Sequence, residues 1–245
     1  MDEVWGAANR CGAPAFEISH FVSHPSGFSM INFDLSLLTD DVADQYVWDW
    51  MDVRAEPLSA EDYLSFAEND LRDGRAARHL VNALSNVKKA LHIRLEDICL
   101  GFGARDLGKL RNFPTLINYA RECGLVAPRV LDRLNAMRNA VEHDYILPTE
   151  SDIDTFLDVT HLFLAATDRW VSRRPCEVGC ESVLVVHDSL NFELYKLDFD
   201  WSQGVAVLHF RECEARGVAP QKNIEYRSPS AEFFSCVRFA LRNSD

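Results

Sequence analysis

Residues 77–101 read ARHLVNALSNVKKALHIRLEDICLG, and this stretch decides the fold expected for the middle of the chain. Its apolar residues recur at steps of three and four, the spacing of one face of an α-helix; they are Ala77, Leu80, Val81, Leu84, Val87, Leu91, Leu95 and Ile98. The stretch therefore predicts one long amphipathic helix, which Gly101 and Gly103 terminate.

Further helices are predicted on both sides of this stretch. Ser59 is a suitable N-cap for a shorter helix that ends at Gly74, and a third helix covers residues 114–123. A fourth helix is predicted to start at Pro128, and a fifth follows with Ser151 as its cap. Four or five antiparallel helices with short connections make a bundle.

The periodicity is two rather than 3.6 toward both ends of the sequence. Residues 15–35 alternate between apolar and polar, which predicts a β-hairpin. Three strands are predicted at Ser182–His187, Phe192–Phe199 and Val205–Phe210, whereas Glu232–Leu241 fits a strand or a helix. A meander of three strands is marginally stable alone, so we expect the hairpin to pair with it or the sheet to pack on the bundle.

The predicted fold class is α+β, with a central antiparallel helical bundle and β elements contributed by the N- and C-terminal segments. Residues 1–54 are assigned to an N-terminal hairpin and an acidic linker, residues 55–172 to the bundle, and residues 173–245 to a β-rich segment. We expect the last segment to pair with the N-terminal hairpin.

Composition limits the function classes. The chain has 245 residues and a net charge of −13, with the acidic residues concentrated near the front. A protein this acidic does not hold duplex nucleic acid by bulk electrostatics, because such binding depends on Lys and Arg. The 20 arginines outnumber the 5 lysines, and planar guanidinium groups suit phosphate geometry. A small, locally basic site that acts on a phosphodiester remains compatible with this composition.

The distribution of cysteines and apolar residues bears on location. The seven cysteines are scattered and odd in number, which favours reduced thiols. No apolar run approaches the ~18 residues of a membrane span, and the N-terminal residues lack the basic flank and apolar core of a secretory signal. We therefore expect a cytoplasmic protein that makes no contact with a membrane.

One motif carries chemistry. Residues 137–148 read MRNAVEHDYILP, in which Arg138 is followed at once by Asn139, five positions on by His143 and seven positions on by Tyr145. This pattern, at the end of a late helix, resembles that of HEPN domains, which are helical bundles with an arginine, a polar residue and a histidine four to six positions after the arginine. The resemblance covers roughly residues 58–170, and the added tyrosine is similar to the subset found in toxin–antitoxin pairs.

The resemblance implies a metal-independent endoribonuclease of toxin or phage-defence type, with RNA as substrate and no cofactor. Arg138 would stabilise the phosphate, His143 would act as general acid and base, and Asn139 would orient groups or contact substrate. Tyr145 would assist at the site or be modified by a nucleotidyltransferase-type antitoxin.

The chemistry of these residue types agrees with RNA cleavage. A guanidinium fork holds a phosphate and stabilises the charge that develops on it, and a histidine with a pKa near neutrality moves protons to and from ribose oxygens. Arg138 and His143 lie about 140° apart around an ideal helix, so one copy presents them on different faces. We therefore expect a homodimer with both copies of the motif near its axis.

Other interpretations remain open. A histidine at a helix end often only satisfies carbonyl groups, so the chain is alternatively a non-catalytic HEPN-like module that binds a partner protein or a nucleotide. Arg72 and His79 also fit a looser form of the motif, but they lie at a helix junction. The stretch 46–50, YVWDW, is a partner-binding patch or a linker that packs its tryptophans on the bundle.

The cysteines offer a weaker alternative. A zinc site can be assembled from residues that lie after the bundle, although buried thiols are favoured because the spacing is not that of a zinc knuckle; the residues are Cys176, Cys180, His187, Cys213 and Cys236.

Overall fold

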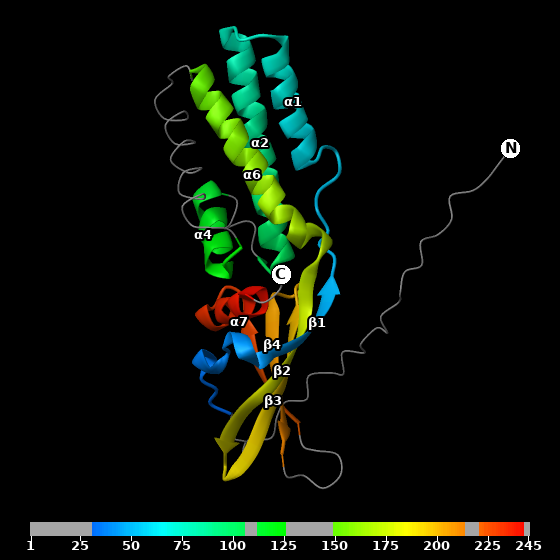
Figure 1. Cartoon of the computed structure of the whole chain (residues 1–245), viewed down its shortest axis with the longest axis vertical. Coiled ribbons are helices and arrows are strands. Elements are labelled where there is room, and N and C mark those ends of the chain that lie inside the picture. The colour runs from blue at the N-terminus through cyan, green and yellow to red at the C-terminus, as the bar shows by residue number, and fades with distance from the viewer. Residues whose placement is uncertain (1–30, 106–111, 126–148, 214–220, 243–245) are drawn as a thin grey trace, which may run out of the picture. The chain divides into compact units, whose positions relative to one another are not determined.

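Helices and strands both contribute heavily to the fold (Figure 1). The computed structural model describes residues 31–105, 112–125, 149–213 and 221–242. Its helices are α1 (Ala60–Asp73), α2 (Ala77–Gly101), α4 (Phe113–Cys123), α6 (Glu150–Ser172) and α7 (Ala231–Arg242). Its strands are β1 (Ala43–Asp49), β2 (Arg174–His187), β3 (Leu190–Asp200), β4 (Val205–Glu212) and β5 (Gln221–Arg227). Two short 3₁₀ helices, η1 (Leu35–Leu37) and η2 (Asp40–Val42), precede β1.

The predicted architecture, a central helical bundle with β elements from the two terminal segments, is wrong, although the fold does mix helices and strands. The described strands form one five-stranded antiparallel sheet in the order β1-β2-β3-β4-β5, which is a major part of the fold rather than a set of minor elements around a bundle. The three predicted strands are confirmed and lie within β2, β3 and β4. The two edge strands were not predicted, because ADQYVWD reads as an acidic, aromatic stretch and QKNIEYR is mainly polar, as an exposed sheet edge often is.

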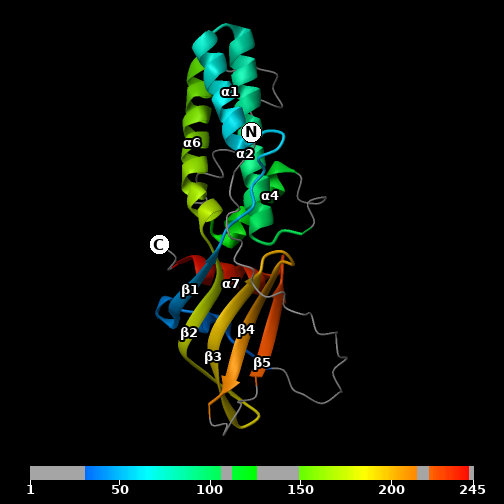
Figure 2. The same cartoon turned by 90° about the vertical axis from the view of Figure 1, so that its right-hand side faces the viewer.

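The helices α1 to α6 are inserted between two strands that pair directly. Asp49 at the end of β1 lies opposite Arg174 at the start of β2, so the chain leaves the sheet and returns to the same place. Figure 2 shows both strands meeting the helices at this end of the sheet. The backbone N–H of Met51 donates to the carbonyl of Val171 at 3.0 Å, which continues the pairing beyond the strands.

The helices begin where local side chains cap them. Ser59 caps α1 in a reciprocal capping box with Asp62, as its position predicts. The cap of α6 is Thr149 rather than the predicted Ser151, because Thr149 forms the capping box with Asp152. The region from Pro128 to residue 148, with the predicted fourth helix, lies outside the described residues, as do residues 15–30 of the predicted hairpin. The described end of that hairpin is not a strand, because residues 31–34 have no regular structure and Leu35 begins η1.

A buried arginine connects three helices that run side by side in Figures 1 and 2. The side chain of Arg94 on α2 is only 3% exposed and donates to Asp168 on α6 at 2.6 Å. It also pairs with Glu61 on α1 and donates to Thr167 at 3.2 Å. These contacts give the guanidinium a partner on each neighbouring helix, which offsets the cost of burying its charge.

One face of the sheet is covered by α7 and by residues 31–42 (Figure 1). Phe33 packs edge-on against Phe210 of β4 with ring centroids 5.3 Å apart. The segment 232–241, which was ambiguous, forms the helix α7 and buries Phe233, Val237 and their neighbours. Its apolar residues recur at helical spacing, so packing against the sheet decides between the two alternatives.

Aromatic rings fill the junction between helices and sheet. The ring centroid of Phe102, just after α2, lies 6.0 Å from that of Trp170 on α6 and 5.1 Å from that of Trp201 after β3. Gly103 and Gly204 meet backbone to backbone here, both with positive φ, and a Cβ on Gly103 would lie 3.0 Å from the Cα of Gly204. Glycine is therefore needed at the end of α2 for close approach to the sheet as well as for helix termination.

None of the helices in the described part of the chain is long and apolar enough to cross a membrane.

Candidate nucleic-acid interface

The four motif residues lie together in one stretch of the sequence, outside the residues that the structure describes. Arg138, Asn139, His143 and Tyr145 lie between residues 126 and 148, outside the described residues. Their roles therefore stay predictions.

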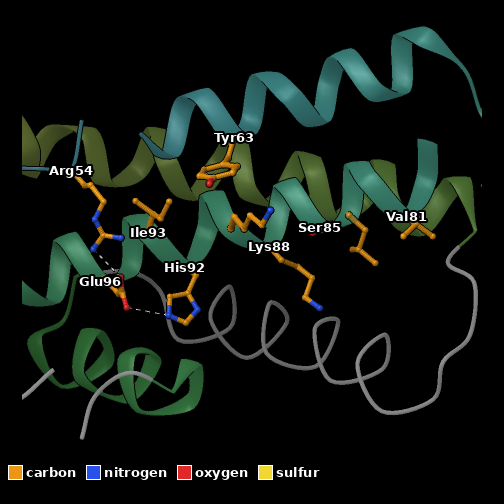
Figure 3. A pocket seen from close by; sticks show the side chains of 10 residues that line it. Arg54, Tyr63, Val81, Ser85, Lys88, His92, Ile93 and Glu96 are labelled. Atoms are coloured by element: carbon orange, nitrogen blue, oxygen red, sulfur yellow. Dashed lines mark hydrogen bonds and ion pairs between the residues drawn. The ribbon is translucent and has the colours of Figure 1, made fainter. Parts of the chain in front are cut away.

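A basic groove runs along α2 (Figure 3). It has a volume of about 600 Å³, and all of its lining residues except Arg54 lie within the segment 55–172 that was predicted to be the bundle. Arg54 before α1 and Tyr63 on α1 line it together with residues of α2, which are Val81, Leu84, Ser85, Lys88, Lys89, His92, Ile93 and Glu96. From Val81 to Glu96 the helix rises by about 22 Å at 1.5 Å per residue, so this is a long groove rather than a closed cavity.

Arg54 is held at one end of the groove by two carboxylates of α2. Its backbone N–H donates to Oδ2 of Asp97 at 3.0 Å, and its guanidinium donates to Oε2 of Glu96 at 2.9 Å. The first bond fixes the backbone of the loop and the second fixes the side chain. About a third of the Arg54 side chain remains exposed, so it can still be reached from the groove.

Glu96 connects Arg54 to His92. Nε2 of His92 lies 3.4 Å from Oε1 of Glu96, one helical turn away, and Figure 3 shows the three side chains in a row. The ring of His92 also lies 6.1 Å from that of Phe113 on α4. A carboxylate at this position orients the imidazole ring.

Tyr63 faces α2 from the neighbouring helix. Nζ of Lys89 lies 5.2 Å from the centroid of the Tyr63 ring, within the range of a cation–π contact. On its other side Tyr63 meets Phe66 edge-on, with ring centroids 6.0 Å apart. The ring is thereby oriented by apolar packing, and one of its faces is covered by the Lys89 side chain.

The charge in the groove is opposite to that of the whole chain. Arg54, Lys88 and Lys89 carry permanent positive charges, whereas Glu96 is the one acidic residue among the described residues that line it. The chain as a whole carries −13. An anion is therefore repelled by most of the surface and attracted here, which is the local basic site that the composition left possible.

Beneath Arg54, Asp97 is buried at 5% exposure. Burial raises the pKa of this carboxyl above its ordinary value, and it outweighs the opposing effects of the hydrogen bond from the Arg54 backbone and of the charges on Arg54 and Arg94. A folded-state pKa above the unfolded one means that the folded protein binds the proton more tightly. The stability that this group contributes is therefore greatest at low pH and is lost as pH rises through the raised pKa.

Asp97→Asn tests this linkage. The amide oxygen can still accept the Arg54 N–H, and the cost of burying a charge disappears, so we expect the free energy of unfolding at pH 7 to rise modestly. The gain should shrink as pH falls toward the ordinary aspartate range, which urea unfolding across pH 4–7 measures. Asp44→Asn on the exposed side of β1 controls for the loss of one negative charge. A lower stability of Asp97→Asn at pH 7 would show that the charge–charge contact with Arg54 dominates instead.

The residues that line the groove form no motif that the sequence alone predicts as a site. A signal exists in hindsight, because Lys88 and Lys89 are two of only five lysines, and Ser85, Lys88 and His92 recur at steps of three and four on the polar side of α2. The contributions of Arg54 and Tyr63 come from other elements, and no local pattern reveals them.

The looser motif at the helix junction lies away from the groove. Arg72 donates to Asn69 at 2.7 Å, and Nε2 of His79 accepts from Nε of Arg78 at 3.1 Å. Both side chains make contacts at the ends of α1 and α2. Neither Arg72 nor His79 lines the groove.

The cysteines and the aromatic stretch 46–50 take part in the packing of the sheet and its surroundings. Burial raises the pKa of the Cys180 and Cys236 thiols to about 12, while Cys213 is exposed. Across the described ranges, no group of three or more His, Cys, Asp and Glu side chains is placed to hold a metal ion. In β1, Trp48 stacks on Tyr46 and lies 3.7 Å from the guanidinium of Arg173, and the tryptophan that follows the strand is exposed.

Comparisons with models of protein families, with curated proteins and with solved structures found no match. The resemblance to HEPN domains therefore stays a prediction that rests on the motif and the helical pattern.

Proposed function

We propose that this chain is a metal-independent endoribonuclease of toxin or phage-defence type, active as a homodimer. The ribose 2′-oxygen attacks the adjacent phosphorus as His143 removes its proton, and the bond from phosphorus to the 5′-oxygen breaks. A protonated histidine returns a proton to that 5′-oxygen, which leaves a 2′,3′-cyclic phosphate and a 5′-hydroxyl. Arg138 stabilises the charge that develops on the phosphate, Asn139 orients the groups, and Tyr145 assists or is the residue modified by an antitoxin.

The observation that supports an RNA substrate best is the basic groove on α2. It offers Arg54, Lys88 and Lys89 in a groove that follows about 22 Å of helix, in a chain of strongly negative net charge. Proteins that bind single strands combine a positive groove along the backbone with an aromatic side chain for the bases. We assign the groove the role of binding the RNA chain, and the motif the role of cutting it.

The double substitution Lys88→Glu with Lys89→Glu tests the groove. The two substitutions lower the net charge of the groove by four units. We therefore expect RNA affinity to fall by at least tenfold at moderate salt. The slope of log affinity against log salt should flatten by about two, since each lysine displaces about one counterion. Fluorescence anisotropy with a labelled oligoribonucleotide measures both quantities.

Arg78→Glu is the matched control, because Arg78 is exposed on the same helix but does not line the groove. It should change affinity only slightly. Equal losses from Arg78→Glu and from the lysine pair would mean that general charge, and not the groove, governs binding.

The second candidate is a non-catalytic module that binds a nucleotide. The groove volume favours it, since about 600 Å³ falls within the usual size of small-molecule sites. This function requires saturable mononucleotide binding by a chain that cuts no RNA under any condition, and isothermal titration with ATP and GTP together with a cleavage assay distinguishes the two.

A further inference from the structure

We infer that Tyr63 is a base-stacking residue and that the groove selects single-stranded over duplex RNA, an inference that rests on the groove's proposed role in RNA binding. The residues that line the groove divide into two rows. Ser85, Lys88 and His92 succeed one another on α2 at steps of three and four residues. Tyr63 stands on α1, with Lys89 of α2 over its ring, and it supplies the only phenyl ring among the described lining residues (Figure 3).

The first row suits a phosphate backbone. Ser85 to His92 spans about 10 Å of helix axis at 1.5 Å per residue, with a hydroxyl, an ammonium and an imidazole presented in turn. All three groups donate hydrogen bonds to phosphate oxygens, the imidazole through whichever nitrogen is protonated. His92 is oriented for this by Glu96, which lies on the side toward Arg54.

The ring of Tyr63 suits an unpaired base. Phe66 packs against it edge-on at 81°, which leaves a ring face for another group. That face is covered by the Lys89 ammonium at 5.2 Å from the centroid. A base that stacks on the ring displaces the ammonium, and the released lysine can then contact the phosphate of the same nucleotide. Lys89 therefore exchanges one partner for another, and the ring is not left exposed in the free protein.

Discrimination against duplex RNA follows from this arrangement. In an A-form helix the bases are stacked on one another, and proteins contact mainly the phosphates and 2′-hydroxyls. A duplex therefore offers no base to Tyr63. Single strands can place a base on the ring, and base–aromatic stacking is tolerant of sequence because every base has a π-face.

The experiment uses the full chain carrying His143→Ala, so that bound RNA is not cut. The probe is a fluorescein-labelled 12-nucleotide oligoadenylate, and the comparison is the same strand paired with oligouridylate as a duplex. We expect Tyr63→Leu to lower affinity for the single strand about tenfold without altering the salt slope, because stacking carries no charge. Lys89→Ala should lower the salt slope by about one. Tyr63→Phe should bind the single strand as the parent does. The parent should bind the duplex more weakly than the single strand, and Tyr63→Leu should bind the duplex with the same affinity as the parent.

The outcomes separate this inference from the proposed function. The stacking role is overturned if Tyr63→Leu binds the single strand as the parent does, or if the parent binds duplex and single strand with equal affinity. The proposed ribonuclease function still stands in that case if the native chain cleaves RNA. If the parent binds no RNA and the native chain cuts none, both fail. Trp50→Leu, at an exposed tryptophan outside the groove, controls for loss of any surface aromatic and should leave affinity unchanged.

Discussion

Replacing His143 with alanine is expected to slow RNA cleavage by about 10²–10⁴-fold, because general acid and base assistance contributes about that factor. Arg138→Ala should cost about 10²–10³-fold, the usual effect of removing a group that stabilises charge in the transition state. Single-turnover cleavage of a labelled RNA measures both rates. Circular dichroism and thermal unfolding should match the native protein, since Met137 and Val141 rather than these two residues occupy the apolar stripe of the sequence.

His79→Ala is the matched control for the histidine. His79 fits the looser form of the motif, but it accepts a hydrogen bond from Arg78 at the start of α2 and lies outside the groove. Its variant should cleave at the native rate. Cleavage should also persist in EDTA, leave 2′,3′-cyclic phosphate ends and spare DNA, which lacks the attacking hydroxyl. A need for a divalent metal, or normal cleavage by His143→Ala, contradicts the mechanism, and a monomer by light scattering at micromolar concentration contradicts the composite dimer site.

The helices could be predicted because their signals are local. Ser59 and Asp62 form a capping box within four residues, and the apolar residues of α2 recur at helical spacing along about seven turns. The cap of α6 was misplaced by two residues, since Thr149 and Ser151 are each followed three residues later by an aspartate, and only the fold shows that Thr149 pairs with Asp152.

The extent of the sheet could not be predicted in the same way. β1 reads as an acidic, aromatic stretch, and its strand identity depends on pairing with β2, which lies more than a hundred residues later in the sequence. β5 alternates between half-buried and exposed residues without a strongly apolar face. Strand propensity reflects the neighbours that a strand packs against, so edge strands that meet distant partners carry little signal of their own.

The candidate groove shows the same division. Lys88 and His92 belong to one helix and can be grouped from their spacing, whereas Tyr63 and Arg54 reach the groove through the packing of α1 and through the bond from Arg54 to Asp97. The motif at residues 138–145 is the reverse case, because its pattern is visible in the sequence and lies outside the described residues. Sequence therefore indicates the chemistry, and tertiary contacts indicate where a substrate binds.

Arg174→Ala is expected to lower the free energy of unfolding by about 3 kcal/mol, the size of the effect when a buried, hydrogen-bonded ion pair loses one partner. Arg174 begins β2 opposite the end of β1, and its guanidinium donates to Oδ2 of Asp49 at 2.6 Å and to the carbonyl of Trp50 at 3.1 Å. It also donates to the carbonyl of Gly101 at the end of α2. One side chain thus connects both strands to the helices inserted between them, and urea unfolding of the full chain measures its contribution.

Arg173→Ala is the matched control, because the neighbouring arginine is exposed and stacks on Trp48, a contact worth about 0.5–1 kcal/mol. In a double-mutant cycle, Asp49→Asn should cost little once Arg174 is alanine, since Asp49 then has no guanidinium to pair with. The Asp49 side chain is 44% exposed and can be solvated after the loss, so most of the cost should arise from the two carbonyl groups, above all that of Gly101 in the buried junction. A loss in Arg174→Ala no greater than that in Arg173→Ala would mean that the aromatic contacts of Phe102 and Trp201 hold the helices to the sheet without the arginine.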